Sequence, residues 1–238
     1  MWVKVGQTMN TILITGVGRG IGFQLVKEFL DRDYRVIGTV RDEAAQARVT
    51  QLAAELGKTI ETHIVELSEQ ASVDRLKDAL DDCTVDILIN NTGVRGGSED
   101  TYSELDLDDW LTVLQINTLS PMRVTQALMA NLSKSNQPKI VTISSAMGSL
   151  ARERSDSIAY RSSKAALNKA MQCLAVELKP QKIGVYLMHP GWVRTDMGGP
   201  NGDISVEQSA SGLAATLINF DMADSGQFWN YDGERLAW

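Results

Sequence analysis

The amino-acid sequence predicts an α/β fold in which helices cover both faces of one doubly wound parallel sheet of about seven strands. Two observations predict it. Short runs rich in β-branched residues alternate with longer amphipathic segments almost from one end of the chain to the other. No internal repeat, low-complexity tract or linker interrupts the 238 residues, a length that an α/β layout commonly folds as a single domain.

The predicted strands follow the β-branched runs in order. They cover residues 11–15, 34–40, 61–67, 85–90, 139–144 and 184–189. Helices are predicted between them, because apolar residues recur there at the spacing of one helix face. They cover residues 21–32, 44–57, 72–80, 110–132 and 160–179, and a further helical pattern follows at 204–220.

The predicted domain runs over residues 9–238. Residues 1–8 carry no motif and are interpreted as an N-terminal extension or an alternative start before Met9. A Gly-rich, irregular segment at 189–204 predicts a mobile loop, and we expect the substrate loop at about 190–212. The helical pattern behind it could close over a substrate as a lid.

Composition argues against several classes of protein. A net charge of -7 and a pI near 4.9 leave no basic stripe for nucleic acid. Cys83 and Cys173 have no metal-ligand spacing, which indicates reduced thiols in a cytoplasm. His63 and His189 lie far apart in strand-like runs, so we expect no metal site. No apolar run approaches the about 18 residues of a membrane span, so we expect no membrane contact.

The turn after the first strand carries a cofactor signal. It reads GVGRGIG at 16–22 and opens a helix. Glycines allow a tight turn and close backbone approach, and the helix N-terminus offers N–H groups to a phosphate. A lone glycine-rich turn is a weak signal, but strand and helix flank this one. We therefore expect a Rossmann-type dinucleotide site that includes Gly16, Gly18, Arg19, Gly20 and Ile21.

The end of the second strand indicates which dinucleotide is bound. An acidic residue there holds the ribose 2′-hydroxyl of NAD, whereas an arginine suits the 2′-phosphate of NADP. The sequence places Arg41 at this point, and Arg19 in the glycine turn offers a second positive charge. Asp42 follows at once, but an acid one step into the loop can point away or pair with the arginine. NADP(H) is therefore favoured over NAD(H).

Later motifs, taken with the glycine turn, resemble the classical short-chain dehydrogenase/reductase (SDR) family over nearly the whole chain. Residues 15–22, TGVGRGIG, match the family's cofactor turn TGxxxGIG. Residues 90–93 read NNTG where the family has NNAG, so Thr92 adds one hydroxyl near the cofactor. The segment HPGWVRTDMGG at 189–199 resembles the family's PG motif.

The resemblance implies a catalytic set of four residues, which are Asn117, Ser145, Tyr160 and Lys164. Ser145 is favoured over Ser144, because the second serine of the pair, with Gly148 three residues on, fits the family pattern better. Tyr160 would donate a proton to the substrate oxygen or accept one from it. Lys164, one turn along the same helix, would lower the pKa of the phenol and reach the nicotinamide ribose. Ser145 would hydrogen-bond the substrate oxygen, and Asn117 would hold a water that links Lys164 to solvent.

The resemblance also implies further cofactor contacts. Besides the glycine turn and Arg41, these are Glu66, Leu67, Asn91, Gly93, Tyr160, Lys164, Pro190, Val193 and Thr195. Glu66 stands where the family usually has an aspartate by the adenine. Val193 and Thr195 would meet the nicotinamide carboxamide.

The sequence therefore predicts an NADP(H)-dependent oxidoreductase that acts on a small carbonyl compound or secondary alcohol. The segments YRSSKAALN at 160–168 and FWNYDGERLAW at 228–238 resemble the C-factor and small carbonyl-reductase branch of the family. That branch leaves an alternative open, a cofactor-binding regulatory or signalling protein with little turnover. A Tyr–Lys pair four residues apart has a large false-positive risk when taken alone, so the interpretation depends on the order of the motifs along the chain.

Two further expectations concern surfaces. The apolar positions of AALNKAMQCLAVEL at 165–178 suit a helix-pairing face, so we expect a homodimer or homotetramer, although a buried helix has the same pattern. Trp192 and Met197 either line the substrate pocket or serve packing.

Overall fold

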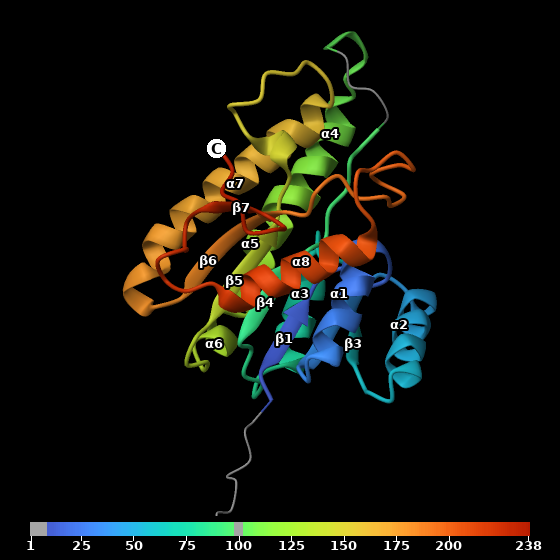
Figure 1. Cartoon of the computed structure of the whole chain (residues 1–238), viewed down its shortest axis with the longest axis vertical. Coiled ribbons are helices and arrows are strands. Elements are labelled where there is room, and N and C mark those ends of the chain that lie inside the picture. The colour runs from blue at the N-terminus through green and yellow to red at the C-terminus, as the bar shows by residue number, and fades with distance from the viewer. Residues whose placement is uncertain (1–8, 98–101) are drawn as a thin grey trace, which may run out of the picture.

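A computed structural model describes residues 9–97 and 102–238, so the predicted extension at 1–8 lies outside the described residues. Seven strands form one fully parallel sheet in the order β3-β2-β1-β4-β5-β6-β7 (Figure 1). They are β1 (Thr11–Ile14), β2 (Arg35–Val40), β3 (Glu61–Ile64), β4 (Ile87–Asn90), β5 (Lys139–Ile143), β6 (Gly184–His189) and β7 (Phe228–Asn230). The predicted parallel sheet of about seven strands is confirmed.

Eight α-helices are described along the chain. They are α1 (Gly20–Asp31), α2 (Glu43–Glu55), α3 (Gln70–Ala79), α4 (Leu107–Leu114), α5 (Ser120–Ala127), α6 (Met129–Leu132), α7 (Ile158–Leu178) and α8 (Val206–Asn219). A π-helical turn, Gln115–Leu119, joins α4 to α5. Short 3₁₀ turns are η1 (Tyr102–Glu104), η3 (Ala146–Gly148) and η4 (Lys179–Gln181).

The strands alternate their side chains between two apolar cores, as the pleat requires. Ile12 and Ile14 of β1 pack with α1, α2 and α8, whereas Leu13 between them packs with α3, α5 and α7. The two sets of helices therefore cover opposite faces of the sheet (Figure 1). Because both faces are covered, the central strands β1, β4, β5 and β6 are buried along almost their whole length.

The expected lid is wrong for the body of α8. Ala210, Leu213, Ala214 and Leu217 are fully buried in the core that α8 shares with α1. A helix that contributes four such side chains to the core cannot swing away without exposing them. The irregular segment before it is tied to itself, with Val193 bridging to Ile204.

The helix predicted over 110–132 is divided into α4, the π turn, α5 and α6. Pro121 lies at the start of α5. Because proline has no N–H, it cannot donate the α-helical bond to the carbonyl of Asn117, four residues earlier. The interruption thus falls at the residue for which the sequence predicts a catalytic role.

Strand order reverses between β1 and β4, which are neighbours in the sheet although β2 and β3 separate them in the sequence. The carboxyl ends of β1, β4, β5 and β6 lie along one edge of the sheet, in the upper half of Figure 1. Ligands bind such sheets beside this reversal. The glycine turn and the NNTG segment follow the two strands that flank it.

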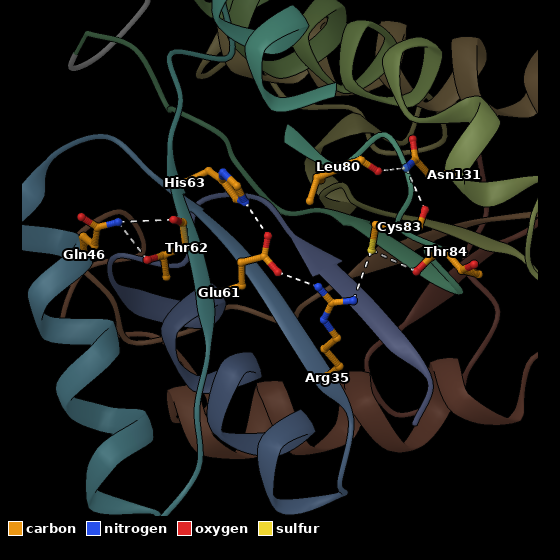
Figure 2. A network of polar contacts seen from close by, with 9 residues as sticks. All are labelled: Arg35, Gln46, Glu61, Thr62, His63, Leu80, Cys83, Thr84 and Asn131. Atoms are coloured by element: carbon orange, nitrogen blue, oxygen red, sulfur yellow. Dashed lines mark hydrogen bonds and ion pairs between the residues drawn. The ribbon is translucent and has the colours of Figure 1, made fainter. Parts of the chain in front are cut away.

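A polar network connects β2 and β3 to the loop before β4 (Figure 2). Arg35 donates to Glu61 at 2.7 Å and lies 3.5 Å from the sulfur of Cys83, while His63 lies 2.9 Å from the other carboxylate oxygen of Glu61. Burial raises the pKa of Glu61, but its bonds to His63 and Arg35 outweigh this and lower it. The network fixes the edge of the sheet, and it involves none of the predicted site residues.

Candidate active site

The glycine turn and the NNTG segment are bonded directly to each other. The side-chain nitrogen of Asn91 donates to the carbonyls of Thr15 at 2.9 Å and Gly16 at 3.2 Å. In return, the hydroxyl of Thr15 accepts from the peptide nitrogens of Asn91 and Thr92, at 3.0 and 3.2 Å. Four bonds across the switch point therefore hold the shape of the turn.

Backbone conformation and packing both require glycine in this turn. Gly16 and Gly20 have φ of 72° and 57°, which side chains rarely adopt. A Cβ on Gly22 would lie 2.4 Å from the carbonyl oxygen of Gly16 and 2.6 Å from the side-chain nitrogen of Asn91. The missing side chain thus lets the first turn of α1 lie against the loop.

The start of α1 has the character of an anion site. No side chain caps the helix, and its first turn holds no acidic residue. The hydroxyl oxygen of Thr92 is buried beside Gly16 and has no hydrogen-bond partner among the described residues. Free N–H groups, a helix dipole and an unpaired hydroxyl fit a phosphate group.

At the end of β2, Arg41 is exposed, and Asp42 stands at the N-cap of α2. The carboxylate of Asp42 accepts from the peptide nitrogen of Ala45 at 2.7 Å and so caps that helix.

Two further charged residues lie near this end of the cradle. Bonds from Ser68 lower the pKa of Glu66, and the nearby charge of Arg41 lowers it further. Sequence reasoning missed Arg48 on α2, whose guanidinium lies 3.5 Å from the carbonyl of Gly18, because only the fold brings α2 to the turn.

The remaining predicted cofactor residues frame the cradle. Gly93 lies where a Cβ would be 3.3 Å from the side-chain oxygen of Asn117 and 3.4 Å from the Lys164 nitrogen. Leu67 and Val193 are buried, and Ile21 is partly buried against the core. The Pro190 carbonyl accepts from the hydroxyl of Ser209, and the Thr195 hydroxyl accepts from the peptide nitrogen of Gly198. Arg19 pairs with Asp196 at 2.9 Å, and both side chains are largely exposed.

Tyr160 and Ser145 come together although fifteen positions separate them in the sequence. Burial raises the pKa of Tyr160, and a hydrogen bond with the side chain of Ser145 partly opposes this. Gly148 makes the approach possible, since a Cβ there would lie 2.7 Å from Lys164. Residues 149–157 form a loop that ends at Ser157 with φ of 54°, and α7 begins at the next residue.

Lys164 is almost fully buried one turn beyond Tyr160. Its nitrogen donates to the carbonyl of Ile143 at 3.0 Å and lies 5.9 Å from the centre of the Tyr160 ring. Burial lowers the pKa of this ammonium to about 8. The pKa of Tyr160 is raised on balance, so the expected lowering by Lys164 stays a prediction for the complex with cofactor.

Asn117 is fully buried in the π turn. Its side-chain oxygen accepts from the peptide nitrogen of Val94 at 2.8 Å, and its nitrogen donates to the carbonyl of Val94 at 2.8 Å and to the hydroxyl of Ser163 at 3.0 Å. The side chain thus holds the chain after NNTG against α7. The backbone carbonyl of Asn117 lacks its α-helical donor because Pro121 has no N–H, so it can accept from the expected water.

Ser144 has a different partner from Ser145. Its hydroxyl donates to the side-chain oxygen of Asn168 at 2.5 Å, and Asn168 donates to the carbonyl of Gly148 at 3.3 Å. The hydroxyl of Ser145 instead accepts from the peptide nitrogen of Met147 at 3.1 Å, on the Tyr160 side. The geometry therefore favours Ser145 as the serine that faces the phenol.

Two other features bear on the location of the site. Trp192 is exposed and donates to the carbonyl of Gly198 at 2.8 Å within its own loop, and Met197 is also exposed. An open cleft of about 800 Å³ lies at the amino ends of the strands and is lined by Thr11, Arg35 and Lys139 among others. We place the site at the opposite edge, because the buried titratable pair and the glycine turn are there.

Comparison with known proteins identifies the family of the chain. The model of the short chain dehydrogenase family matches residues 10–203. The chain belongs to this family. It is an oxidoreductase of the C-factor and carbonyl-reductase branch. The C-signal protein of Myxococcus xanthus is 38% identical over 159 residues, which are 66% of this chain and 95% of that protein.

Two solved structures of the family are also similar. Carbonyl reductase Sniffer of D. melanogaster is 32% identical, with a TM-score of 0.89 over 97% of this chain and 100% of that one. The NADPH-bound carbonyl reductase from chicken fatty liver is 30% identical, with a TM-score of 0.88 over 98% of this chain and 100% of that one.

Within the described ranges, no helix of this SDR is long and apolar enough to cross a membrane. Those same ranges contain no cluster of His, Cys, Asp and Glu suited to a metal ion.

Proposed function

We propose that this SDR is an NADPH-dependent reductase of small carbonyl compounds, with Tyr160 as the proton donor. One observation carries the proposal. Tyr160, Ser145 and Lys164 converge at the carboxyl ends of the strands, and Gly93 connects them to the phosphate cradle. Solved carbonyl reductases that contain NADPH or NADP support it.

The residues present fit the cofactor. The glycine turn and the start of α1 would hold the pyrophosphate, Arg41 the 2′-phosphate, Glu66 and Leu67 the adenine end, and Val193 and Thr195 the carboxamide. When bound, NADPH supplies a hydride to the carbonyl carbon. The cradle lies at the same sheet edge as Tyr160, so the carbonyl can be reached from both.

The protein residues handle the proton and the developing charge. Ser145 donates a hydrogen bond to the carbonyl oxygen as it becomes negative, and the Tyr160 hydroxyl transfers its proton to that oxygen. Lys164, largely protonated at pH 7 with a pKa of about 8, stabilises the resulting phenolate and binds the ribose hydroxyls. A water on the Asn117 carbonyl connects Lys164 to solvent, so that the phenol is reprotonated.

Arg41 is predicted to decide between the two dinucleotides. Arg41→Ala should raise KM for NADPH about tenfold or more and change KM for NADH little, because only the 2′-phosphate needs the guanidinium. Steady-state kinetics with both cofactors measures this. Arg75→Ala, an exposed arginine on α3, is the matched control. Equal effects on both cofactors would contradict the assignment of Arg41 to the 2′-phosphate.

Substituting the two serines should change different properties of the protein. Ser145→Ala is expected to lower kcat about 10²-fold, since it removes a donor to the developing oxyanion. Ser144→Ala leaves the side-chain oxygen of Asn168 without its donor and should mainly lower the free energy of unfolding, by about 1–3 kcal/mol. Measuring kcat and Tm for both variants tests the assignment, and the reverse pattern would show that Ser144 faces the substrate.

A cofactor-binding regulatory or signalling protein is the second candidate, supported by the likeness to the C-signal protein. The four filled catalytic positions weigh against it. The deciding experiment is a screen of NADPH oxidation with aldehydes, ketones and quinones, beside NADPH binding by fluorescence. Turnover of any of them supports the reductase, whereas tight binding without turnover supports the regulator.

The homodimer or homotetramer stays a prediction. Leu107 and Leu111 on α4 and Val176 on α7 are exposed apolar side chains on the helices expected to pair. Sedimentation analysis of the full chain would determine the oligomeric state.

A further inference from the structure

Arg95 occupies a fixed place beside the proposed catalytic residues. It follows Val94, whose peptide nitrogen and carbonyl are both bonded to the side chain of Asn117 at 2.8 Å. Gly93, one residue earlier, lies against Lys164. The backbone that carries Arg95 is therefore held by the site itself.

The guanidinium of Arg95 lies next to the helical turn that carries Tyr160. Its Nη2 atom is 3.4 Å from the hydroxyl of Ser157, a buried residue that immediately precedes α7. Tyr160 follows three residues later. Burial raises the pKa of Tyr160, whereas the charge of Arg95, like the bond from Ser145, lowers it. Arg95 is therefore a positive charge close to the helical turn that carries the phenol.

No carboxylate among the described residues neutralises Arg95. It is absent from the ion pairs of residues 9–97 and 102–238. Asp109 is close to this loop, but its carboxylate accepts from the peptide nitrogen of Gly97 at 2.7 Å. Arg161, on the same helix as Tyr160, is by contrast paired with Asp156 at 2.9 Å. In a chain of net charge -7, an exposed arginine beside the phenol is suited to an anionic ligand.

We propose that Arg95 binds a carboxylate of the substrate and so selects carbonyl compounds that carry one. The inference rests on the proposed reductase function and names its substrate class. A guanidinium matches the two oxygens of a carboxylate, and a charge-assisted pair at the edge of the site holds the carbonyl toward Tyr160. Hydride addition to the carbonyl carbon and proton transfer to its oxygen give the alcohol, and the carboxylate is unchanged.

The test compares 3- and 4-formylbenzoate with their methyl esters, which differ in charge and little in shape. NADPH oxidation is followed for the wild type, Arg95→Gln, Arg95→Lys and the control Arg75→Gln. Arg95→Gln should lower kcat/KM for at least one acid about tenfold or more and change that of its ester less than about twofold. Arg95→Lys should keep part of the preference, and Arg75→Gln should keep all of it.

Two outcomes would overturn the inference while the proposed function stands. One is an equal loss for acids and esters in Arg95→Gln, which would mean that Arg95 acts on Tyr160 alone. The other is reduction of esters and acids alike by the wild type, with no effect of the substitution.

A wild type that reduces none of the four compounds counts against the proposed function instead. In that case, calorimetry with 4-(hydroxymethyl)benzoate and NADPH decides the inference. Weaker binding of this acid to Arg95→Gln than to the wild type supports the carboxylate site, and equal or undetectable binding overturns it.

Discussion

Replacing Tyr160 with phenylalanine is expected to lower kcat for carbonyl reduction about 10²- to 10⁴-fold, the range typical of a lost general acid. The substitution removes one oxygen and keeps the ring, so the fold and the packing of Lys164 over the ring should remain. NADPH should still bind, because the cradle is built by other residues. Stopped-flow measurement of hydride transfer, beside NADPH binding by fluorescence, checks both halves of the prediction.

Tyr34→Phe is the matched control for this variant. Tyr34 packs edge-on against Phe29 at a centroid distance of 5.2 Å, far from the carboxyl ends of the strands, and its loss of a hydroxyl should leave kcat unchanged. If Tyr160→Phe kept more than about a tenth of the wild-type kcat, Tyr160 would not be the proton donor. The reductase would then need another acid at the site.

Replacing Gly22 with alanine should weaken NADPH binding about tenfold or more. Helix propensity alone would favour alanine by about 1 kcal/mol. The new Cβ would however lie 2.4 Å from the carbonyl of Gly16 and 2.6 Å from the nitrogen of Asn91, so the turn or α1 must move. Because the phosphate site is made of that turn and that helix end, a shift of either reduces affinity. Fluorescence titration with NADPH and thermal unfolding measure the two effects.

Gly57→Ala is the control that distinguishes a loss of stability from a loss of the phosphate site. Gly57 has φ of 65° with open space around it, so alanine there should cost about 1 kcal/mol of stability through backbone strain and leave NADPH affinity unchanged. Wild-type NADPH affinity in Gly22→Ala would contradict the assignment of this turn to the phosphate.

Local patterns were sufficient for much of the fold. β-branched runs and amphipathic segments predicted six of the seven strands and the order of the helices, because hydrophobic periodicity is a property of neighbouring residues. The division of the helix at 110–132 was not predicted, although Pro121 gave a signal for it. The lid was wrong because a pattern of apolar residues does not say which surface they bury against, and α8 buries them against α1.

The sequence by itself determined the family, the order of the motifs and the residue types at each proposed position. Only the tertiary structure decided which of two neighbouring serines faces Tyr160 and that Asp42 caps α2. It also decided that Arg48 lies beside Gly18 and Arg95 beside Ser157. The physical reason is that these choices depend on the direction of a side chain and on contacts between segments far apart in the chain. Spacing along one segment does not specify either.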